Sequence, residues 1–455
     1  MSDKKILVLS VGGSPEPLII SINTFKPDAV YFIHSKETLE TIKNVVSEVP
    51  FEFSYKTKLI ENPESLQESF DKSREVLLEL NKEEYNIHID FTGGTKPMVA
   101  GLILASTGDK YIDSCEYTYV GSKAMEGARD KNGVGIVKNG FEMIKPQKDP
   151  FETYAILEFN RGKDFFNNYQ FEASLKNFKD AKSKLDDGSL KDLAEFYINL
   201  VNLYQSWDKF NSKLIVYNEK LDKNEKFKLS TYLQKEIIEK CPKKSLMKDF
   251  RNFDEFYKQL ENNLKFLRLK LSNNVQKGIV YYLPDLLNNA RRKIDMGAYD
   301  DGVARLYRSI ELIAQLELNK LGLIDKNKLR DNHVFYINRE QFNLETMDHT
   351  KAKEQVSKWH IKDYEEREDT FKLALVKSFT LLKLFDIQLA RDYFADRELE
   401  SAVKNKRNNS ILAHGLEPLS KESANDFYDR VLSYAIRAYP DIEKYMELAK
   451  FPKLE

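Results

Sequence analysis

Residues 86–97, NIHIDFTGGTKP, decide the fold of the first part of this chain. Their opening run alternates around isoleucines and predicts a strand. The two glycines that follow, Gly93 and Gly94, allow the backbone to turn tightly and to approach a ligand closely. Pro97 stands where a helix would begin, a position at which its missing N–H is not needed. The stretch therefore predicts a strand, a glycine-rich loop and a helix in immediate succession.

The same alternation of strands and helices extends over the first third of the chain. Strand-like runs lie at residues 5–10, 29–34, 86–91 and 114–120, with a weaker one at 51–55, and helical spacing is found at 36–48, 63–81 and 96–107. This order indicates a mostly parallel sheet with helices on its faces. We therefore predict an α/β, Rossmann-like domain over residues 1–147, closed by a hairpin at Lys138-Asn139-Gly140.

The rest of the sequence is predicted to be all-α. Residues 148–276 read as a helical connector, and residues 277–455 as a second domain. Within that domain we expect helices at 284–296, 299–321, 371–394 and 423–438, with a charged, irregular insertion at 323–370.

The composition is that of a folded protein with more than one domain. At 455 residues the chain is too long for a single hydrophobic core. Lys plus Arg (71) and Asp plus Glu (72) nearly cancel, which disfavours a protein that coats nucleic acid through its overall charge. Any RNA site must therefore be a local patch.

The cysteines and the N-terminus bear on the cellular location. Cys115 and Cys241 lie far apart in the sequence and have no metal-ligand spacing, which favours two reduced thiols. The apolar run that ends at Leu9 is too short for a signal peptide or a membrane span. We expect a cytoplasmic protein with no membrane partner.

A second glycine-rich loop resembles the first. Gly12-Gly13-Ser14-Pro15 follows the strand at residues 5–10, just as Gly93-Gly94-Thr95-Lys96-Pro97 follows the later one. The carboxyl ends of parallel strands share one edge of a sheet, where such folds bind ligands. Free N–H groups at a helix start attract anions, and Lys96 and Thr95 add a positive charge and a hydroxyl donor. The two loops together predict a phosphate-binding site.

These two loops also carry a family resemblance. A strand followed by TGGTK and a helix, with a GGSP loop after the first strand, is similar to the CARF domains of CRISPR-associated proteins. The resemblance implies a dimer that binds a cyclic oligoadenylate across its twofold axis. It also implies that Thr95 and Lys96 contact that ligand, while the backbones of Gly12, Gly13, Ser14, Gly93 and Gly94 line it.

A second constellation lies at residues 404–415, KNKRNNSILAHG. On an ideal helix Arg407 and His414 would share one face, about 10 Å apart. A histidine can transfer protons near neutral pH, and an arginine can stabilise negative charge on a phosphorane. The pair therefore suits RNA cleavage by the 2′-OH, which leaves a 2′,3′-cyclic phosphate and a 5′-OH. We find no convincing metal-ligand spacing in the sequence and expect no metal and no cofactor.

The segment resembles the signature of the HEPN ribonucleases, which is Arg, a polar residue, and then His after a short gap. Here Asn408 fills the polar position and six residues separate Arg407 from His414. The resemblance implies that Arg407, Asn408 and His414 are catalytic. It further implies an obligate homodimer whose active site is completed by both protomers.

A CARF domain followed by a HEPN domain is the order of the auxiliary ribonucleases of type III CRISPR-Cas systems. The resemblance implies a homodimer that a cyclic oligoadenylate, a tetra- or hexa-adenylate, activates to cut single-stranded RNA, with no role for DNA. Two alternatives stay open. One is a HEPN toxin-type RNase that another nucleotide or an antitoxin regulates. The other is a non-catalytic, ligand-responsive RNA-binding regulator.

Overall fold

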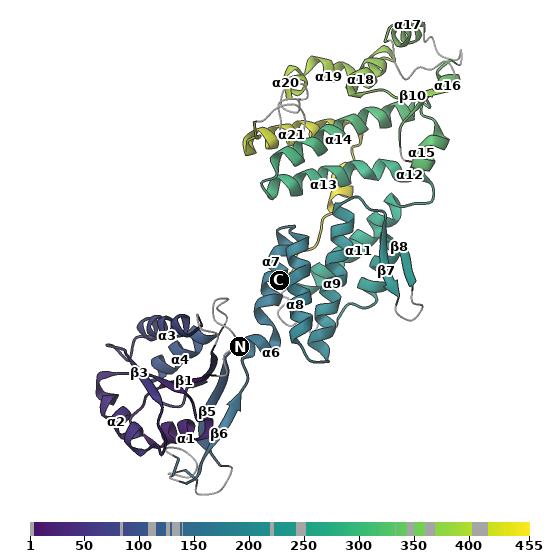
Figure 1. Ribbon diagram of the computed structural model, residues 1–455. Coiled ribbons are helices and arrows are strands. Elements are labelled where there is room, and N and C mark those ends of the chain that lie inside the picture. Colours follow the sequence, from purple (N-terminus) through teal and green to yellow (C-terminus); the bar gives the residue numbers. More distant parts are fainter. Residues whose placement is uncertain are drawn as a thin grey trace. The chain divides into compact units, whose positions relative to one another are not determined.

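The computed structural model describes residues 4–81, 85–107, 115–123, 128–129, 137–138, 140–218, 223–242, 252–332, 334–343, 350–359, 369–402 and 417–455. The chain forms two compact units (Figure 1). The first comprises Met1–Phe159 and Ser183–Asp187, and the second comprises Asn160–Lys182 and Gly188–Glu455.

The first unit is built on a six-stranded sheet with the order β3-β2-β1-β4-β5-β6. Its strands are β1 (Lys5–Ser10), β2 (Ala29–His34), β3 (Ser54–Leu59), β4 (Asn86–Asp90), β5 (Glu116–Ser122) and β6 (Glu142–Gln147). All pairs are parallel except β5–β6, which is antiparallel. The predicted α/β class with a mostly parallel sheet is therefore confirmed.

Helices cover both faces of this sheet (Figure 1). They are α1 (Glu16–Phe25), α2 (Leu39–Glu48), α3 (Leu66–Asn81) and α4 (Lys96–Ser106), and a short helix, α6 (Pro150–Tyr154), follows β6. In β1 the side chains alternate: Leu7 and Leu9 join the core beneath α1 and α2, while Ile6 and Val8 join the core beneath α3 and α4. The unbroken apolar run of β1 thus reflects burial on both sides.

The third strand and the closing hairpin of this unit differ from the prediction or fall partly outside the described residues. The weak strand expected at residues 51–55 is instead β3 at Ser54–Leu59, because Phe51 and Phe53 pack against the core before the exposed edge strand begins. The expected hairpin turn is present only in part: Gly140 has a positive φ of 87°, and Asn139 lies outside the described residues.

The second unit begins with helices, as predicted for the connector, but it also contains a hairpin that the sequence analysis missed. The elements up to residue 281 are α7 (Ile156–Asn167, which begins in the first unit), α8 (Phe171–Lys184), α9 (Ser189–Asp208), β7 (Lys213–Asn218), β8 (Lys223–Lys228), α10 (Leu229–Tyr232), a π-helix (Leu233–Ile238), α11 (Phe253–Lys270), α12 (Val275–Gly278) and a 3₁₀ turn (Ile279–Tyr281). The antiparallel pair β7–β8 contradicts an all-helical connector.

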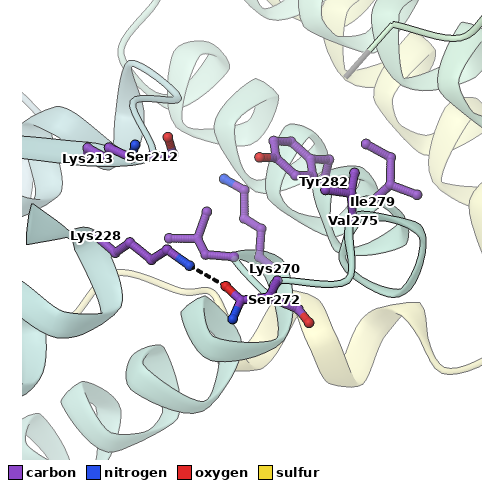
Figure 2. Close-up of a pocket in the computed structure, with 10 residues that line it drawn as sticks. Ser212, Lys213, Lys228, Lys270, Ser272, Val275, Ile279 and Tyr282 are labelled. Carbon is purple, nitrogen blue, oxygen red and sulfur yellow. Dashed lines mark hydrogen bonds between the residues drawn. The ribbon is translucent and has the colours of Figure 1, made fainter. Parts of the chain in front are cut away.

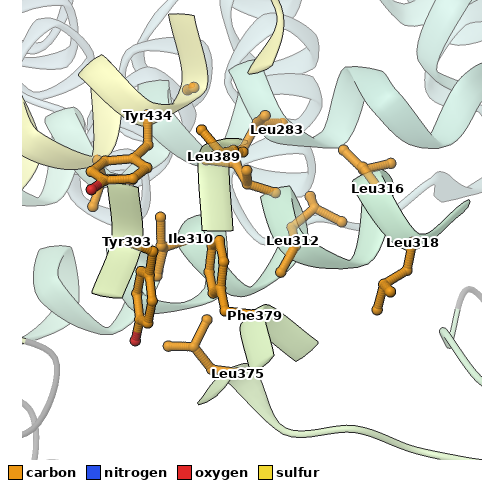
Figure 3. Packing of buried hydrophobic residues seen from close by; sticks show 14 of the residues in the cluster. Leu283, Ile310, Leu312, Leu316, Leu318, Leu375, Phe379, Leu389, Tyr393 and Tyr434 are labelled. Carbon is orange, nitrogen blue, oxygen red and sulfur yellow. The ribbon is translucent and has the colours of Figure 1, made fainter. Parts of the chain in front are cut away.

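The C-terminal part is a helical bundle around one apolar core (Figure 3). Its main helices are α13 (Tyr282–Asp295), α14 (Tyr299–Lys320), α18 (Leu375–Leu384), α19 (Gln388–Ala395) and α21 (Lys421–Ala438). Leu283, Ile310 and Phe379 from three of these helices meet in the core, and the rings of Phe379 and Tyr393 stack with centroids 4.0 Å apart. The predicted all-α domain is confirmed.

Two helix predictions in this bundle were too simple. The single helix expected at 371–394 is interrupted, because Asp386 adopts the left-handed conformation (φ 62°) and ends α18 before α19 begins. The expected irregular insertion contains α15 (Lys326–Asn332), β9 (Ile337–Asn338), α16 (Arg339–Asn343), α17 (Thr350–Lys358) and β10 (Thr370–Phe371). Two further helices are α20 (Arg397–Ser401) and α22 (Ile442–Leu448).

Buried ion pairs join the connector helices to α13. At the end of α9, the buried Asp208 carboxylate accepts hydrogen bonds from Arg292 Nε at 2.8 Å and Lys293 Nζ at 2.9 Å. Burial acts to raise the pKa of Asp208, but the charges of Arg292 and Lys293 outweigh it and hold the pKa below its usual value. Removing one partner of such a pair leaves the other charge buried without compensation.

We predict that Asp208→Ala lowers the free energy of unfolding of the second unit by about 3–5 kcal/mol, because Arg292 loses its buried counter-charge. The measurement is urea unfolding followed by tryptophan fluorescence, since both tryptophans, Trp207 and Trp359, belong to this unit. The matched control is Asp295→Ala, which removes an exposed pair with Arg291 and should change stability by less than about 1 kcal/mol. Equal effects of the two substitutions would contradict this account.

Candidate functional site

The two predicted glycine loops meet at the carboxyl edge of the sheet. A Cβ atom on Gly93 would lie 2.6 Å from the Ser10 carbonyl oxygen and 2.7 Å from the Gly12 backbone nitrogen. A Cβ atom on Gly12 would lie 2.9 Å from the Gly94 nitrogen. Contacts this short with backbone atoms exclude any side chain, so glycine is required where the loops cross. The pairing of β1 with β4 brings the loops together.

A cavity of about 310 Å³ opens beside this crossing point. Both loops line it, through Gly12, Gly13, Ser14, Thr92, Gly93 and Gly94. The remaining lining residues are Glu16, Pro17, Leu18, Tyr119, Val120, Arg129, Val137 and Glu142. Five of the seven residues predicted to bind a ligand therefore share one cavity.

A buried carboxylate, Asp90 at the end of β4, fixes the loop that follows this strand. Asp90 is fully buried and accepts hydrogen bonds from the Ser21 hydroxyl and, at 2.8 Å, from the Thr92 backbone N–H. Burial raises the pKa of the Asp90 carboxyl, and the hydrogen bonds from Ser21 and Thr92 oppose that shift. The Thr92 hydroxyl accepts from Val120 N at 2.7 Å. These bonds fix the loop that follows β4 relative to β5.

The other two predicted ligand residues, Thr95 and Lys96, do not line this cavity. The Thr95 hydroxyl donates to the Pro63 carbonyl oxygen and accepts from Met98 N at 3.4 Å, so it caps the start of α4. Lys96 is the first residue of α4 and is exposed. The site therefore offers backbone groups at its centre and the charge of Lys96 outside the cavity.

The sequence analysis missed the residues that close the cavity from β5 and β6. Tyr119 stacks on Phe91 with ring centroids 5.9 Å apart, and Arg129 Nε donates to Ser122 Oγ at 3.0 Å. Glu142 accepts a hydrogen bond from Gly140 N at 2.7 Å. Tyr119 is brought to the loops by the pairing of β5 with β4, and Glu142 by the pairing of β6 with β5. A single sequence gives no direct signal of these pairings.

The predicted catalytic residues Arg407, Asn408 and His414 lie outside the described residues. The charged residues of α14, in the same domain, pair with one another: Arg305 with Asp301 at 2.9 Å and Arg308 with Glu311 at 3.0 Å. This is the pattern of a salt-bridged helix surface.

The described part of the chain shows neither a metal-binding cluster nor a membrane-spanning helix. Among those residues no group of three or more His, Cys, Asp or Glu side chains is arranged to hold a metal ion. In the same ranges no helix is long and apolar enough to cross a membrane.

Comparisons with known proteins concern both units. A family model for the Csm6 HEPN domain matches residues 271–438. The structure of Enterococcus italicus Csm6, bound to cyclic hexa-2′-fluoro-hexa-dAMP, matches with a TM-score of 0.51 and 15% identity, covering 98% of each chain. Can2 from Sulfobacillus thermosulfidooxidans, in complex with cyclic tetra-adenylate, matches 49% of this chain and 75% of its own, with 13% identity and a TM-score of 0.21, too low to carry an argument.

Comparison with curated proteins gives no match. At 15% identity the likeness to the Enterococcus protein concerns the fold, and that fold extends over the whole chain. Residues 271–438 match the model of the Csm6 HEPN domain, and the fold of the chain as a whole is similar to that of the Enterococcus Csm6.

Proposed function

We propose that this chain is a metal-independent endoribonuclease that a cyclic oligoadenylate activates to cut single-stranded RNA in type III CRISPR antiviral defence. One observation carries the proposal: two glycine loops meet over a single cavity at the carboxyl edge of a parallel sheet, in a chain whose residues 271–438 match the Csm6 HEPN domain. The Csm6 of similar fold was bound to a cyclic hexanucleotide, which supports a tetra- or hexa-adenylate as activator. The wide spacing of the two cysteines, Cys115 and Cys241, is in keeping with a cytoplasmic protein.

The ligand site suits a phosphate-bearing molecule. The Gly12–Ser14 and Gly93–Gly94 loops line a cavity near the start of helices α1 and α4, where helix dipoles and free backbone N–H groups favour negative charge. The glycines that line the cavity carry no side chain of their own, so a ligand there can approach their backbone closely. The exposed Lys96 adds long-range attraction, weakened by salt.

The cleavage chemistry is assigned to Arg407, Asn408 and His414. His414 moves a proton, either taking it from the 2′-OH or giving it to the departing 5′-oxygen. Arg407 keeps its charge throughout and stabilises the phosphorane oxygens, and Asn408 orients one of the two. Because one Arg–His pair on a helix spans about 10 Å, we infer that two protomers complete the site in a homodimer.

Activation requires that the ligand bind the active state more tightly than the inactive one. A ligand of equal affinity for both states shifts nothing, however tightly it binds. We infer that the oligoadenylate binds across the twofold axis of the first unit's dimer and binds the active state more tightly than the inactive one. Its binding thereby alters the distance between the two Arg–His pairs.

We predict that His414→Ala and Arg407→Ala each reduce RNA cleavage at least about a hundredfold, because each removes proton transfer or charge stabilisation. The measurement is a fluorogenic RNA assay in excess EDTA with cyclic tri-, tetra- and hexa-adenylate as activators. The control is Arg430→Ala, whose guanidinium pairs with Asp396 on the same bundle, and it should stay within about twofold. Full activity of either catalytic variant would remove the assignment, and loss of wild-type activity in EDTA with recovery by a divalent metal would overturn the metal-free mechanism.

The same assay separates the two alternatives. A toxin-type RNase would cut RNA but ignore all three rings, whereas an RNA-binding regulator would bind RNA without cutting it, both before and after His414→Ala.

We predict that Lys96→Ala raises the activator concentration for half-maximal cleavage several-fold and leaves cleavage without activator unchanged. The charge of Lys96 lies outside the cavity, so its effect is long-range and should shrink at high salt. The matched control is Lys43→Ala on α2, an exposed lysine paired with Glu40. An identical dose response of the Lys96→Ala variant and the wild type would contradict a role of this lysine in ligand attraction.

We predict that Gly93→Ala abolishes the thermal shift that the activator produces, because a methyl group there clashes with the backbone of the other loop. In the wild type, ligand at about one hundred times Kd stabilises by about 2.7 kcal/mol. Ser47→Ala is the control, since Ser47 is exposed on α2 and does not line the cavity, and the substitution should preserve the shift. Circular dichroism of both variants separates loss of the site from loss of the fold, and a normal shift in a folded Gly93→Ala protein would sink the loop assignment.

A further inference from the structure

The β7–β8 hairpin presents a basic face that the proposed function does not use. Its register places Lys213 directly opposite Lys228, and Ile215 opposite Lys226, all on one exposed face of the pair. Ile215 is 60% exposed although it lies in a strand. Like charges directly opposite one another destabilise a strand pair. The hairpin therefore retains an unfavourable arrangement of charge that an anion would relieve.

A pocket of about 230 Å³ adjoins this lysine pair (Figure 2). Lys213 and Lys228 lie on its hairpin side, Val275, Ile279 and Tyr282 face them from the other side, and Lys270 lies between (Figure 2). Ser212, Leu271, Ser272 and Asn273 complete the lining. The pocket thus has a cationic wall with hydroxyl and amide groups, and an apolar wall.

The charge inside the pocket is positive. Lys270 is buried and paired with the buried Asp285, so its charge is already balanced within the protein. Lys228 Nζ donates to the neutral Asn273 side-chain oxygen at 2.7 Å. Among the described residues no carboxylate lines the pocket, and none forms an ion pair with Lys213 or Lys228. Two lysine charges therefore face the pocket without a counter-ion from that part of the chain.

We propose that this pocket binds one nucleotide unit, with its phosphate at Lys213 and Lys228 and its sugar or base against Leu271, Val275 and Ile279. A cationic wall opposite an apolar wall matches the two halves of a nucleotide, and the volume suits one such unit rather than a ring of several. The near-neutral overall charge (71 basic and 72 acidic residues) makes this a local feature and not a consequence of a basic protein. The unit is either a free mononucleotide or a nucleotide within an RNA strand.

The test measures binding, so its outcome does not depend on cleavage or on cyclic oligoadenylate. Full-length protein is titrated into a fluorescein-labelled 2′-O-methyl decauridylate, which has no 2′-OH to attack, and anisotropy is followed at several salt concentrations. The double variant Lys213→Gln, Lys228→Gln should weaken binding about tenfold and flatten the dependence of log K on log salt by about 0.7, the value for one phosphate that is no longer neutralised on a single strand.

The matched control is Lys223→Gln, Lys226→Gln, which removes two lysines from the same hairpin outside the pocket. It should change affinity less than about twofold, and the melting temperatures of both double variants should equal or slightly exceed that of the wild type. Equal weakening by the two double variants would mean diffuse attraction, and no weakening by the pocket variant would mean no site there; either result overturns the proposal.

Competition with AMP and with adenosine distinguishes the source of the nucleotide. Displacement of the RNA by AMP but not by adenosine supports a pocket that a free mononucleotide can fill. Displacement by neither, with the Lys213→Gln, Lys228→Gln effect on RNA retained, supports a nucleotide held as part of a strand. Displacement by adenosine as well as by AMP would overturn the assignment of the phosphate to the two lysines.

Discussion

Two buried carboxylates decide how the second unit holds together. Asp208 at the end of α9 and Asp285 on α13 are both buried. Each forms an ion pair with a cation of another helix: Asp208 with Arg292 of α13, and Asp285 with Lys270 of α11. Asp285 accepts from Trp207 Nε1 at 2.9 Å and from Lys270, so one carboxylate joins α9, α11 and α13. A buried charge without its partner is costly, so these helices cannot separate without a large free-energy penalty.

The C-terminal tail strengthens the same junction. After α22 the chain returns to the connector helices, where the Phe451 ring packs over the Arg292 guanidinium at 3.9 Å and against Trp207 with centroids 5.2 Å apart. Leu454 is buried, and its backbone N–H donates to the Asn167 side-chain oxygen at 2.8 Å. The connector and the first bundle helices are thus tied by ion pairs, rings and tail together. A displacement of α9 must therefore be passed to α13, which gives the proposed activation a physical route.

Local sequence patterns predicted most of the fold. The features that the sequence did not predict depend on pairing between residues far apart in the chain. The strand before Gly93 and the loop crossing followed from periodicity and paired glycines, because both depend on neighbouring residues. The hairpin at Lys213 was missed although β7 has a strand-like apolar run (KLIVYN), because its partner β8 (KNEKFK) is polar and lysine-rich and is identified only by the pairing. Tyr119 reaches the cavity because β5 pairs with β4, and Glu142 because β6 pairs with β5. Asp386 ends α18 because its backbone is left-handed, and the residue type alone did not predict that conformation.

The chemistry of the first cavity sets a condition on its ligand. Backbone N–H groups at the crossing glycines favour phosphate, yet Glu16 and Glu142 line the same space and would repel it. Arg129 adds a positive charge to the same lining, so the cavity carries both signs of charge, and a ligand that presents only negative charge leaves the two carboxylates without a partner on the ligand. A molecule that places phosphates at the loops and hydrogen-bond donors at the carboxylates satisfies both walls, since a buried carboxylate needs a donor when it loses water. Adenine carries an exocyclic amino group that can donate, so an oligoadenylate meets this condition where inorganic phosphate does not.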